Sequence, residues 1–281
     1  MSTLKNKIDF VALLSVQMAN PNGDPLNGNR PRTDYNGLGE ISDVCIKRKI
    51  RNRMQDMGNS IFVQSNERSD DGHNNLKDRA ADAIKKVKDN DEYAKTACEK
   101  WLDVRSLGQV FAFTGEKKGG VSVGVRGPVS IHQAVSVSPV EVHSMQITKS
   151  VNSEPGDKKS SDTMGMKHMV RFGLYVVKGS INVQLAQKTG FTNTDALTIK
   201  ECLRTLFEND SSSARPEGTM EVVKLFWWEH DCPSGQYSSA KVHRLIRVSK
   251  KEGIESPESI RDFYIDLDEL PNLKCEEIDG L

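Results

Sequence analysis

Hydrophobic and polar positions near the N-terminus predict a strand followed by a helix. The apolar run at 8–18 (IDFVALLSVQM) is short and ends at Asn-Pro-Asn-Gly, which is typical of a buried strand entering a turn. Residues 41–57 predict a helix, with Ser42 as its N-cap and Gly58 as its stop. The apolar stripe that this helix would bury consists of Ile46, Ile50, Met54 and Met57.

The middle of the chain predicts two more helices and then a series of strands. The helices are expected at about 76–89 and 91–103. The strands are expected at 107–113, 121–137 and 140–148. A turn-rich polar segment, 151–165, separates the last of these strands from another alternating run at 167–177, so the two runs predict a long β-hairpin.

The C-terminal half continues this mixed pattern. Strands are expected at 179–187, at 220–228, at 238–249 and within RDFYIDLDEL (261–270), and a helix capped by Thr194 is expected at 194–209. This order of elements is that of an α+β domain, and a ferredoxin-like sheet is one such arrangement. At 281 residues the chain is long for one ordinary domain and short for two, so one core domain with large insertions is predicted.

Composition and cysteine content favour a cytoplasmic protein with a buried core. Apolar residues make up 36% of the chain and charged residues 28%. No stretch approaches the ~18 apolar residues of a transmembrane helix, and the N-terminal MSTLKNKIDF lacks the apolar region of a secretory signal. The five cysteines are scattered and odd in number, which favours reduced thiols over a disulfide framework. We therefore expect no membrane partner.

Charge is distributed unevenly, although the net charge is zero. Residues 30–53 hold seven Lys and Arg against three Asp and Glu, and residues 143–188 hold the same numbers. The last 31 residues reverse the balance, with ten acidic side chains against three basic ones. Because salt screens charges beyond roughly 10 Å, a local basic surface can bind phosphates despite a distant acidic segment. The alternative is that these are ordinary solvated faces.

The sequence contains none of the motifs that would predict a catalytic or metal centre. The phosphate loop, the dinucleotide-binding glycine motif, paired Cys-x-x-Cys motifs and the nucleophile elbow do not occur. The six histidines never occur as His-x-His or His-x-x-x-His, and no carboxylate marks itself as a general acid or base. We therefore expect a binding protein without catalytic residues, cofactor or metal, not an enzyme.

The loop between the first strand and the first helix, NPNGDPLNGNRPRTDYNG (20–37), combines groups that suit a sugar-phosphate chain. Its glycines and asparagines admit positive φ angles and expose backbone N–H groups. Arg30 and Arg32 supply planar forks that match phosphate oxygens. The following helix adds cations along one flank, namely Lys47, Arg48 and Arg51. The alternative is a surface loop whose arginines pair with Asp24 and Asp34.

The predicted hairpin carries a second group of cations, interleaved with methionines. The cations are Lys149, Lys158, Lys159, Lys167, His168 and Arg171. The methionines are Met164, Met166 and Met169. Flexible apolar side chains beside cations can wedge between bases while the cations hold phosphates. The alternative is that the methionines belong to the core at the base of the hairpin, which we expect for Met169.

These motifs, taken together and in this order, resemble a known family. The loop NPNGDPLNGNRPRTD, the basic helix CIKRKIRNRM and the later QITKSVN…TMGMKHMVRFGLYVVKG are similar to the repeated backbone subunit of type I-C CRISPR surveillance complexes. That subunit is the Csd-type member of the CRISPR-associated seven superfamily in Cascade. The resemblance extends from about Ile8 to about Trp228, whereas the chain beyond Ser249 matches no pattern of the family.

The resemblance implies a fold shaped like a hand. Its palm would be a modified RNA-recognition motif, in a single domain that spans residues 1–281. A helical finger region is expected at about 58–105 and a β-hairpin thumb at about 139–177. Beyond the resemblance, the charge of the last residues predicts an acidic C-terminal tail at about 250–281.

The resemblance also implies a function. Copies would stack head-to-tail along a CRISPR RNA, and each copy would hold guide phosphates in a basic groove. The thumb would displace a nucleotide at regular intervals, so that the bases between pair with target DNA. Partners would be the CRISPR RNA, further copies of the chain, the other Cascade subunits and, through the guide, target DNA. The implied RNA contacts are Asn20, Asn22, Arg30 and Arg32 in the loop, Lys47, Arg48 and Arg51 on the helix, and Lys149, Lys167, His168 and Arg171 on the thumb.

Two other functions remain open at this point. Backbone subunits of type III complexes cut RNA with an aspartate in a loop near the first helix, and Asp34 lies in a comparable region. A second possibility is an RNA-binding module that acts as a monomer. For the acidic tail, one hypothesis is that it faces the basic surface of a neighbouring copy.

Overall fold

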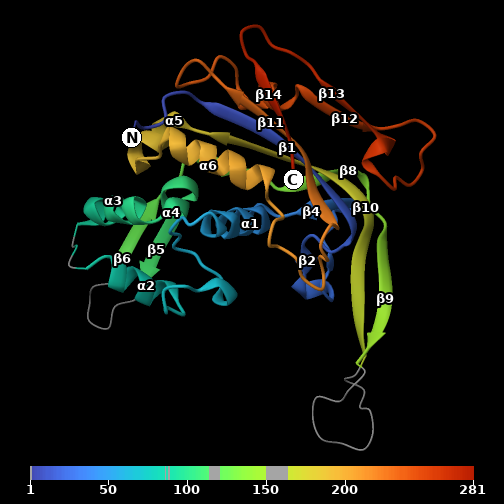
Figure 1. Cartoon of the computed structure of the whole chain (residues 1–281), viewed down its shortest axis with the longest axis horizontal. Coiled ribbons are helices and arrows are strands. Elements are labelled where there is room, and N and C mark those ends of the chain that lie inside the picture. Colours follow the sequence, from blue (N-terminus) through green and yellow to red (C-terminus); the bar gives the residue numbers. More distant parts are fainter. Residues whose placement is uncertain (1, 86, 88, 114–120, 150–163) are drawn as a thin grey trace, which may run out of the picture.

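The computed structural model describes residues 2–85, 87, 89–113, 121–149 and 164–281, and its centre is an eight-stranded antiparallel sheet (Figure 1). The strands lie across this sheet in the order β14 (Cys275–Asp279), β11 (Met220–Glu229), β1 (Ile8–Ala19), β10 (Met164–Ile181), β8 (Ala134–Pro139) and β4 (Leu38–Ile41). Two further strands pair with β10, namely β7 (Val129–Ile131) and β9 (Val142–Thr148). The chain is therefore a mixed α/β protein built around a large antiparallel sheet.

Helices and smaller hairpins surround the sheet. The α-helices are α1 (Asp43–Asp56), α2 (Leu76–Ala83), α3 (Asn90–Lys100), α4 (Leu102–Leu107), α5 (Val183–Thr189), α6 (Asn193–Arg204) and α7 (Ser239–His243). The two-stranded pairs are β2 (Gly23–Asp24) with β3 (Arg30–Pro31), β5 (Gln109–Phe113) with β6 (Val121–Val125), and β12 (Ile246–Lys250) with β13 (Phe263–Leu267). The short 3-10 turns are η1 (Pro25–Asn27), η2 (Asn66–Arg68) and η4 (Ile260–Asp262). In the described part of the chain, no helix combines the length and the apolar content needed to cross a membrane.

The first predicted strand and helix are confirmed, and both follow from local physics. Strand β1 pairs with β10 along one edge and with β11 along the other. Its two faces lie in two different hydrophobic clusters, so both are covered and its residues can be apolar without alternation. At the start of α1, the Ser42 hydroxyl accepts a hydrogen bond from the Cys45 N–H at 3.2 Å. The helix ends before Gly58, which has a φ of 79°.

Two hydrophobic clusters cover the two faces of the sheet. The first lies between the sheet and helices α1 and α6, and it includes Ile46 and Ile50 from α1 and Ile199 and Leu203 from α6. The second lies on the opposite face and includes Val242 of α7 and Ile246 and Phe263 of the β12–β13 hairpin. Figure 1 shows this hairpin above the sheet, so we call this face the upper face and the face of α1 and α6 the lower face. Burial of this apolar area is the main source of stability, at roughly 25 cal/mol per Å².

A third cluster forms a separate core to one side of the sheet. Its centre is a group of packed aromatic rings. The ring centroid of Phe62 lies 4.7 Å from that of Trp101 and 5.0 Å from that of Phe111. Helices α2, α3 and α4 and the β5–β6 hairpin contribute to this unit, which we call the finger. The two-stranded hairpin belongs to the finger because Phe111 and Val123 lie in the same core.

Three of the local predictions that the structure contradicts have a capping residue as their cause. The segment 179–187, predicted as a strand, divides into the end of β10 and helix α5, because the Asn182 side chain accepts from the Leu185 N–H. The segment 238–249 divides in the same way into α7, capped by Ser238, and β12. Helix α6 begins after Thr192, not Thr194, because Thr192 and Asp195 form a reciprocal capping box.

The acidic C-terminal segment is folded into the molecule. Strand β13 pairs with β12, and β14 pairs with β11 at the edge of the main sheet. Phe263 and Leu273 are buried in the cluster on the upper face, and Ile278 packs against the cluster on the lower face. The predicted edge strand in RDFYIDLDEL is confirmed as β13.

A buried polar cluster joins the start of β1 to the end of β11. The fully buried carboxylate of Asp9 accepts hydrogen bonds from Lys7 and His230, both at 2.9 Å. Burial alone would raise the pKa of Asp9, but hydrogen bonds from His230, Ser239 and Lys7 lower it below its ordinary value. His243 is also buried and contacts the Gly179 carbonyl at 2.9 Å. These two histidines therefore have partners within the fold.

Candidate nucleic-acid interface

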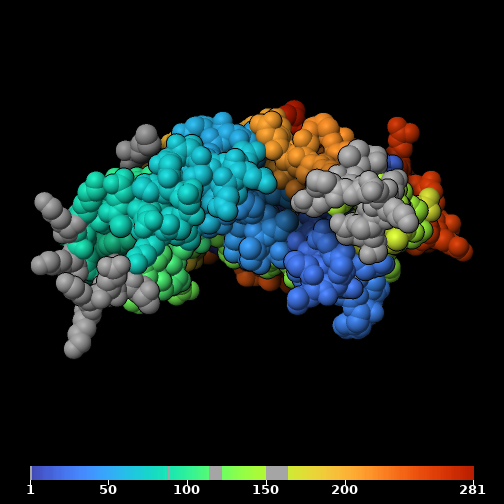
Figure 2. Space-filling view, turned by 90° about the horizontal axis from the view of Figure 1, so that it is seen from below, coloured from blue at the N-terminus to red at the C-terminus, as the bar shows by residue number. Residues whose placement is uncertain are grey.

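The loop 20–37 and helix α1 lie on the lower side of the sheet, between two projecting parts of the molecule. The finger projects downward on one side, and the described part of the β9–β10 hairpin, which we call the thumb, projects downward on the other (Figure 1). Seen from below, the loop and α1 occupy the surface between them (Figure 2). A linear polymer bound across this surface would contact the finger, the thumb and the loop with α1.

Two asparagine side chains fix the loop through hydrogen bonds to the backbone. The buried Asn20 side chain donates to the Asn29 carbonyl at 2.7 Å, where Asn29 itself has a φ of 58°. The Asn22 side chain accepts from the Ser42 N–H at 2.9 Å and so fixes the loop to the start of α1. The predicted role of both residues as RNA contacts stays a prediction, since the contacts observed are to the chain's own backbone.

Arg30 connects the loop to the thumb. Its guanidinium lies 3.1 Å from the Ser144 hydroxyl on β9 and 3.3 Å from Nδ1 of His168 on β10. The same Nδ1 lies 2.8 Å from Ser144 Oγ. Because arginine can only donate, Nδ1 of His168 is the acceptor, and the ring carries its proton on Nε2. The thumb therefore presents the Nε2–H donor of His168 beside the Arg30 guanidinium.

Strand register places Lys167 and His168 on opposite faces of the thumb. Ser144 is paired with His168 and Met145 with Lys167, and side chains alternate between the two faces of a strand. Met166 and Gln146 therefore share the face of His168, which is the face that Arg30 contacts. One continuous basic groove would require Arg30 and Lys167 to lie on the same face of the thumb. The strand register places them on opposite faces instead.

Two of the predicted helix cations hold the finger. Arg51 contacts the Asp103 carboxylate at 3.0 Å, and the fully buried Asp103 also accepts from the backbone N–H groups of Phe62 and Val63. Arg48 donates to the Val63 carbonyl at 2.7 Å, and burial lowers its pKa. Both side chains thus join α1 to the finger, and any contact with RNA would use the part of each guanidinium that remains accessible.

The other cations of α1 differ in their exposure. Lys47 is partly exposed and pairs with Asp43 one turn earlier, at 2.9 Å. Lys49 is buried and pairs with Asp210, and burial lowers its pKa although the Asp210 carboxylate opposes this. Arg53 is buried and donates to the Thr205 hydroxyl at 3.0 Å. Of these three, Lys47 has the position best suited to an external phosphate.

The remaining predicted residues are dispersed. Arg32 lies 3.5 Å from Asp24, the pairing that the sequence left open as an alternative. Arg171 is exposed at the base of the thumb, 3.3 Å from Glu141 and 3.8 Å from Glu258. Lys149 is exposed just after the end of β9. Lys158 and Lys159 lie outside the described residues.

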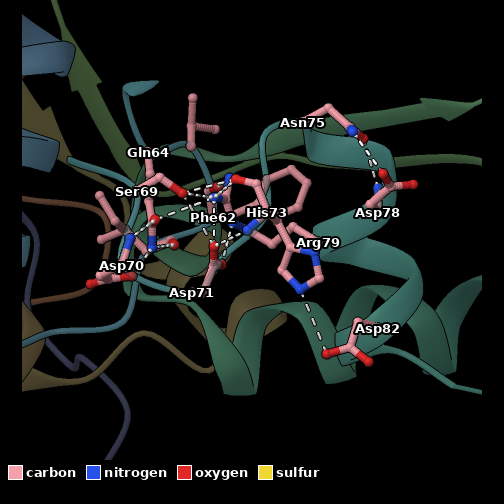
Figure 3. A network of polar contacts seen from close by, with 12 residues as sticks. Phe62, Gln64, Ser69, Asp70, Asp71, His73, Asn75, Asp78, Arg79 and Asp82 are labelled. Atoms are coloured by element: carbon pink, nitrogen blue, oxygen red, sulfur yellow. Dashed lines mark hydrogen bonds and ion pairs between the residues drawn. The ribbon is translucent and has the colours of Figure 1, made fainter. Parts of the chain in front are cut away.

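The finger side of the interface is a loop wrapped around one buried arginine (Figure 3). Arg79 of α2 donates to both carboxylate oxygens of Asp71 and to the backbone carbonyls of Phe62 and His73. The hydrogen bonds from Arg79 lower the pKa of Asp71 to about 2. Arg79 therefore holds the segment 64–75, which lies between α1 and α2, against the finger.

Sequence reasoning missed Ser144 as a member of the interface. The alternation of VHSMQIT placed it on a strand, but its contact with Arg30 depends on the pairing of β9 with β10 and on the position of β3 beside β10. A correct register for the hairpin would have placed it opposite His168. Nothing in the local sequence indicates that residue 30 lies beside residue 144.

The sequence places the chain in a known family. The family model of CRISPR-associated protein Cas7 matches residues 6–268, so the chain belongs to the Cas7 family. A curated relative, the CRISPR-associated protein Cas7 of Haloferax volcanii, is 25% identical over 288 residues, which cover 96% of this chain and 83% of the relative. The predicted superfamily is confirmed.

A solved structure shows the same fold. It is a chain of a CRISPR RNA-guided surveillance complex in a pre-nicking state, with a TM-score of 0.52 and 16% sequence identity. The similarity covers 84% of this chain and 81% of that chain. The fold described above is therefore one that occurs in such a complex.

Proposed function

We propose that this chain is the CRISPR RNA-binding subunit that repeats along the guide in a type I-C surveillance complex and presents it to target DNA. Membership of the Cas7 family supports a place in CRISPR defence. The quoted loop, helix and hairpin motifs support the type I-C assignment. The observation that carries the proposal is the contact of Arg30 with Ser144 and His168, which joins the loop and the thumb into one surface.

The order of strands and helices supports an RNA-recognition-motif palm. Along the chain, the elements follow the order β1, α1, β8, β10, α6, β11, and the four strands lie side by side as β11-β1-β10-β8. Helices α1 and α6 cover the same face. This is the order of a ferredoxin-like β-α-β-β-α-β unit, into which the finger and the thumb are inserted.

In the proposed mechanism, some side chains hold the guide phosphates and others displace a base. Arg30 and Lys47 hold guide phosphates, because a guanidinium fork and an ammonium point charge bind phosphate oxygens without reading bases. Met166 lies on the thumb face that carries His168 and is more than half exposed. A flexible thioether there can wedge between bases while the neighbouring cations hold the backbone. Sequence is then read by base pairing, not by the protein.

Copies assemble head-to-tail on the guide in this proposal. A heterologous contact that does not close into a ring produces an open helix. The zero net charge of the chain suits this, because identical subunits with a large charge of one sign would repel each other. Binding to the guide should weaken steeply with salt, as it does wherever lysines and arginines replace phosphate counterions.

The proposal is tested by co-expressing the chain with a CRISPR array and sequencing the RNA that co-purifies. Enrichment of array transcripts is expected. Arg30→Glu should lower the retained RNA on the order of ten-fold, because it removes a phosphate contact and adds a repulsive charge. Arg244→Glu is the matched control, since Arg244 is exposed at the C-terminal end of α7 and makes no ion pair among the described residues.

Two results would contradict the proposal. The first is RNA retention in Arg30→Glu equal to that of the control, with both variants as thermally stable as the wild type. The second is a particle that stays monomeric when guide RNA is added, which would favour the monomeric RNA-binding module.

The contacts of Asp34 support a structural role for this residue. Its carboxylate accepts from the backbone N–H groups of Asn36 and Leu38, both at 2.8 Å, and so organises the turn that leads into β4. We propose that Asp34 is a turn residue and that the chain does not cut RNA. Periodic cuts in complementary RNA with Mg²⁺, lost in Asp34→Ala, would reverse this assignment.

A further inference from the structure

An acidic loop projects at the thumb end of the molecule. Residues 252–258 (EGIESPE) connect β12 to η4, and we call this segment the acidic loop. Glu252, Glu255 and Glu258 are exposed along it, and the segment contains no cation. Glu252 and Glu255 have no ion-pair partner among the described residues, whereas Glu258 lies 3.8 Å from Arg171. Two of the three carboxylates thus remain available to an external cation.

A basic groove lies at the opposite end of the molecule. It runs between α3, the end of β6 and α5, at the junction of finger and palm, and has a volume of about 470 Å³. Lys95, Arg126 and Lys188 line it, are exposed, and have no ion-pair partner in the part of the chain that the structure describes. Figure 1 places α3 and α5 at one end of the long axis and the connection after β12 at the other.

We infer that the acidic loop of one copy docks into the basic groove of the next copy along the guide. The inference rests on the proposed head-to-tail assembly, in which a surface at one end of the chain must meet a surface at the other end. A projecting loop suits a groove in shape, and the two available carboxylates, Glu252 and Glu255, are opposite in charge to the unpaired cations of the groove. Complementary charges of this kind set the register and partner choice of an interface more than its affinity.

The lining of the groove favours a protein occupant over a nucleic acid. Ala94, Leu185 and Cys98 line it with apolar surface, and Asp91 lowers its net positive charge. A path for a sugar-phosphate backbone is instead lined mainly by cations and hydrogen-bond donors.

Charge exchange between the two surfaces tests the inference. The groove variant carries Lys95→Glu and Lys188→Glu, the loop variant carries Glu252→Lys and Glu255→Lys, and a third variant combines all four. Assembly of the purified chain on guide RNA is followed by sedimentation at low salt. Each two-site variant should raise the protein concentration for half-maximal assembly on the order of ten-fold, and the combined variant should return it to within about three-fold of wild type.

A control and the contrary outcomes complete the design. Arg244→Glu with Lys274→Glu reverses two exposed cations elsewhere and should leave assembly unchanged. The inference is overturned if the combined variant assembles no better than either two-site variant. It is also overturned if the groove variant binds guide RNA more weakly while the loop variant binds it as the wild type does. That result would make the groove a nucleic-acid path. If the wild type itself fails to assemble on RNA, the proposed function is at fault instead.

Discussion

At the scale of single residues, burial separates two kinds of cation in this interface. Arg32 and Lys47 form partly exposed ion pairs with Asp24 and Asp43. Such pairs are worth about 0 to 1 kcal/mol, so a phosphate can replace the carboxylate at little cost. Arg51 pairs with the fully buried Asp103, and breaking such a pair leaves an unpaired buried charge. The cations of the exposed pairs are therefore the ones available to an external phosphate.

The Asp71 carboxylate makes stability dependent on pH. Its pKa in the folded protein is about 2, against 3.8 as the ordinary value, because Arg79 hydrogen-bonds to the charged form. The unfolded chain therefore takes up a proton first as the pH falls, so the contribution of Asp71 is complete above about pH 4 and is lost between about pH 4 and pH 2. Asp71→Asn should cost on the order of 1 kcal/mol at neutral pH, after allowance for partial exposure.

Denaturant unfolding across pH measures this effect. The difference between wild type and Asp71→Asn should shrink as the pH falls toward 2. Asp231→Asn is the control, because Asp231 is exposed and its carboxylate has no hydrogen bond among the described residues. A difference that stays constant with pH would show that Asp71 acts through something other than its charge.

At the scale of elements, side chains at the ends and flanks of helices decide how neighbouring segments pack. Asp103 of α4 receives Arg51 of α1 and two backbone N–H groups from the segment between them. One carboxylate thus orients the finger relative to the palm. The capping residues Asn182 and Ser238 act more locally and convert two predicted strands into a short helix with a strand beside it.

Loss of the Asp103 carboxylate should destabilise the whole chain. Asp103→Ala leaves Arg51 and the N–H groups of Phe62 and Val63 without their acceptor, and a buried group of this kind is worth about 3 to 5 kcal/mol. Asp43→Ala removes an exposed carboxylate from a helix cation and should cost less than about 1 kcal/mol. Equal unfolding free energies for the two variants would contradict the role given to Asp103.

At the scale of the whole molecule, the acidic segment completes the fold. Strand β14 covers the outer edge of β11, and without it a long row of backbone donors and acceptors in β11 would be open to other chains. Gly280 lies so close to Val222 that an added Cβ would come within 1.6 Å of its carbonyl oxygen. The C-terminus therefore packs tightly against the sheet.

Removal of residues 275–281 should destabilise the protein and promote aggregation. The loss of strand pairing and of the Ile278 contact with the core is expected to cost about 2 to 4 kcal/mol. Removal of Leu281 alone, which is 62% exposed, is the control and should leave the melting temperature nearly unchanged. A truncated chain that melts with the wild type and stays monodisperse would show that β14 is dispensable.

Local chemistry in the sequence by itself determined much about this protein. The apolar run of β1, the stripe and caps of α1 and the alternation of the hairpin depend on neighbours within a few residues, and so they could be predicted. The combined loop, helix and hairpin motifs identified the superfamily in the same way. The caps of α5 and α6 are present in the sequence too, but the apolar alternation of 179–187 and the second threonine, Thr194, favour other boundaries.

Only the tertiary structure decided which cations meet which partners. The contact of Arg30 with Ser144, the capture of Arg51 by Asp103 and the placement of Lys167 opposite His168 depend on register and on packing between distant segments. The same holds for Lys95, Arg126 and Lys188, which come from three separate elements. A local pattern determines which face a side chain occupies on its own element, whereas its partner is determined by how the elements pack.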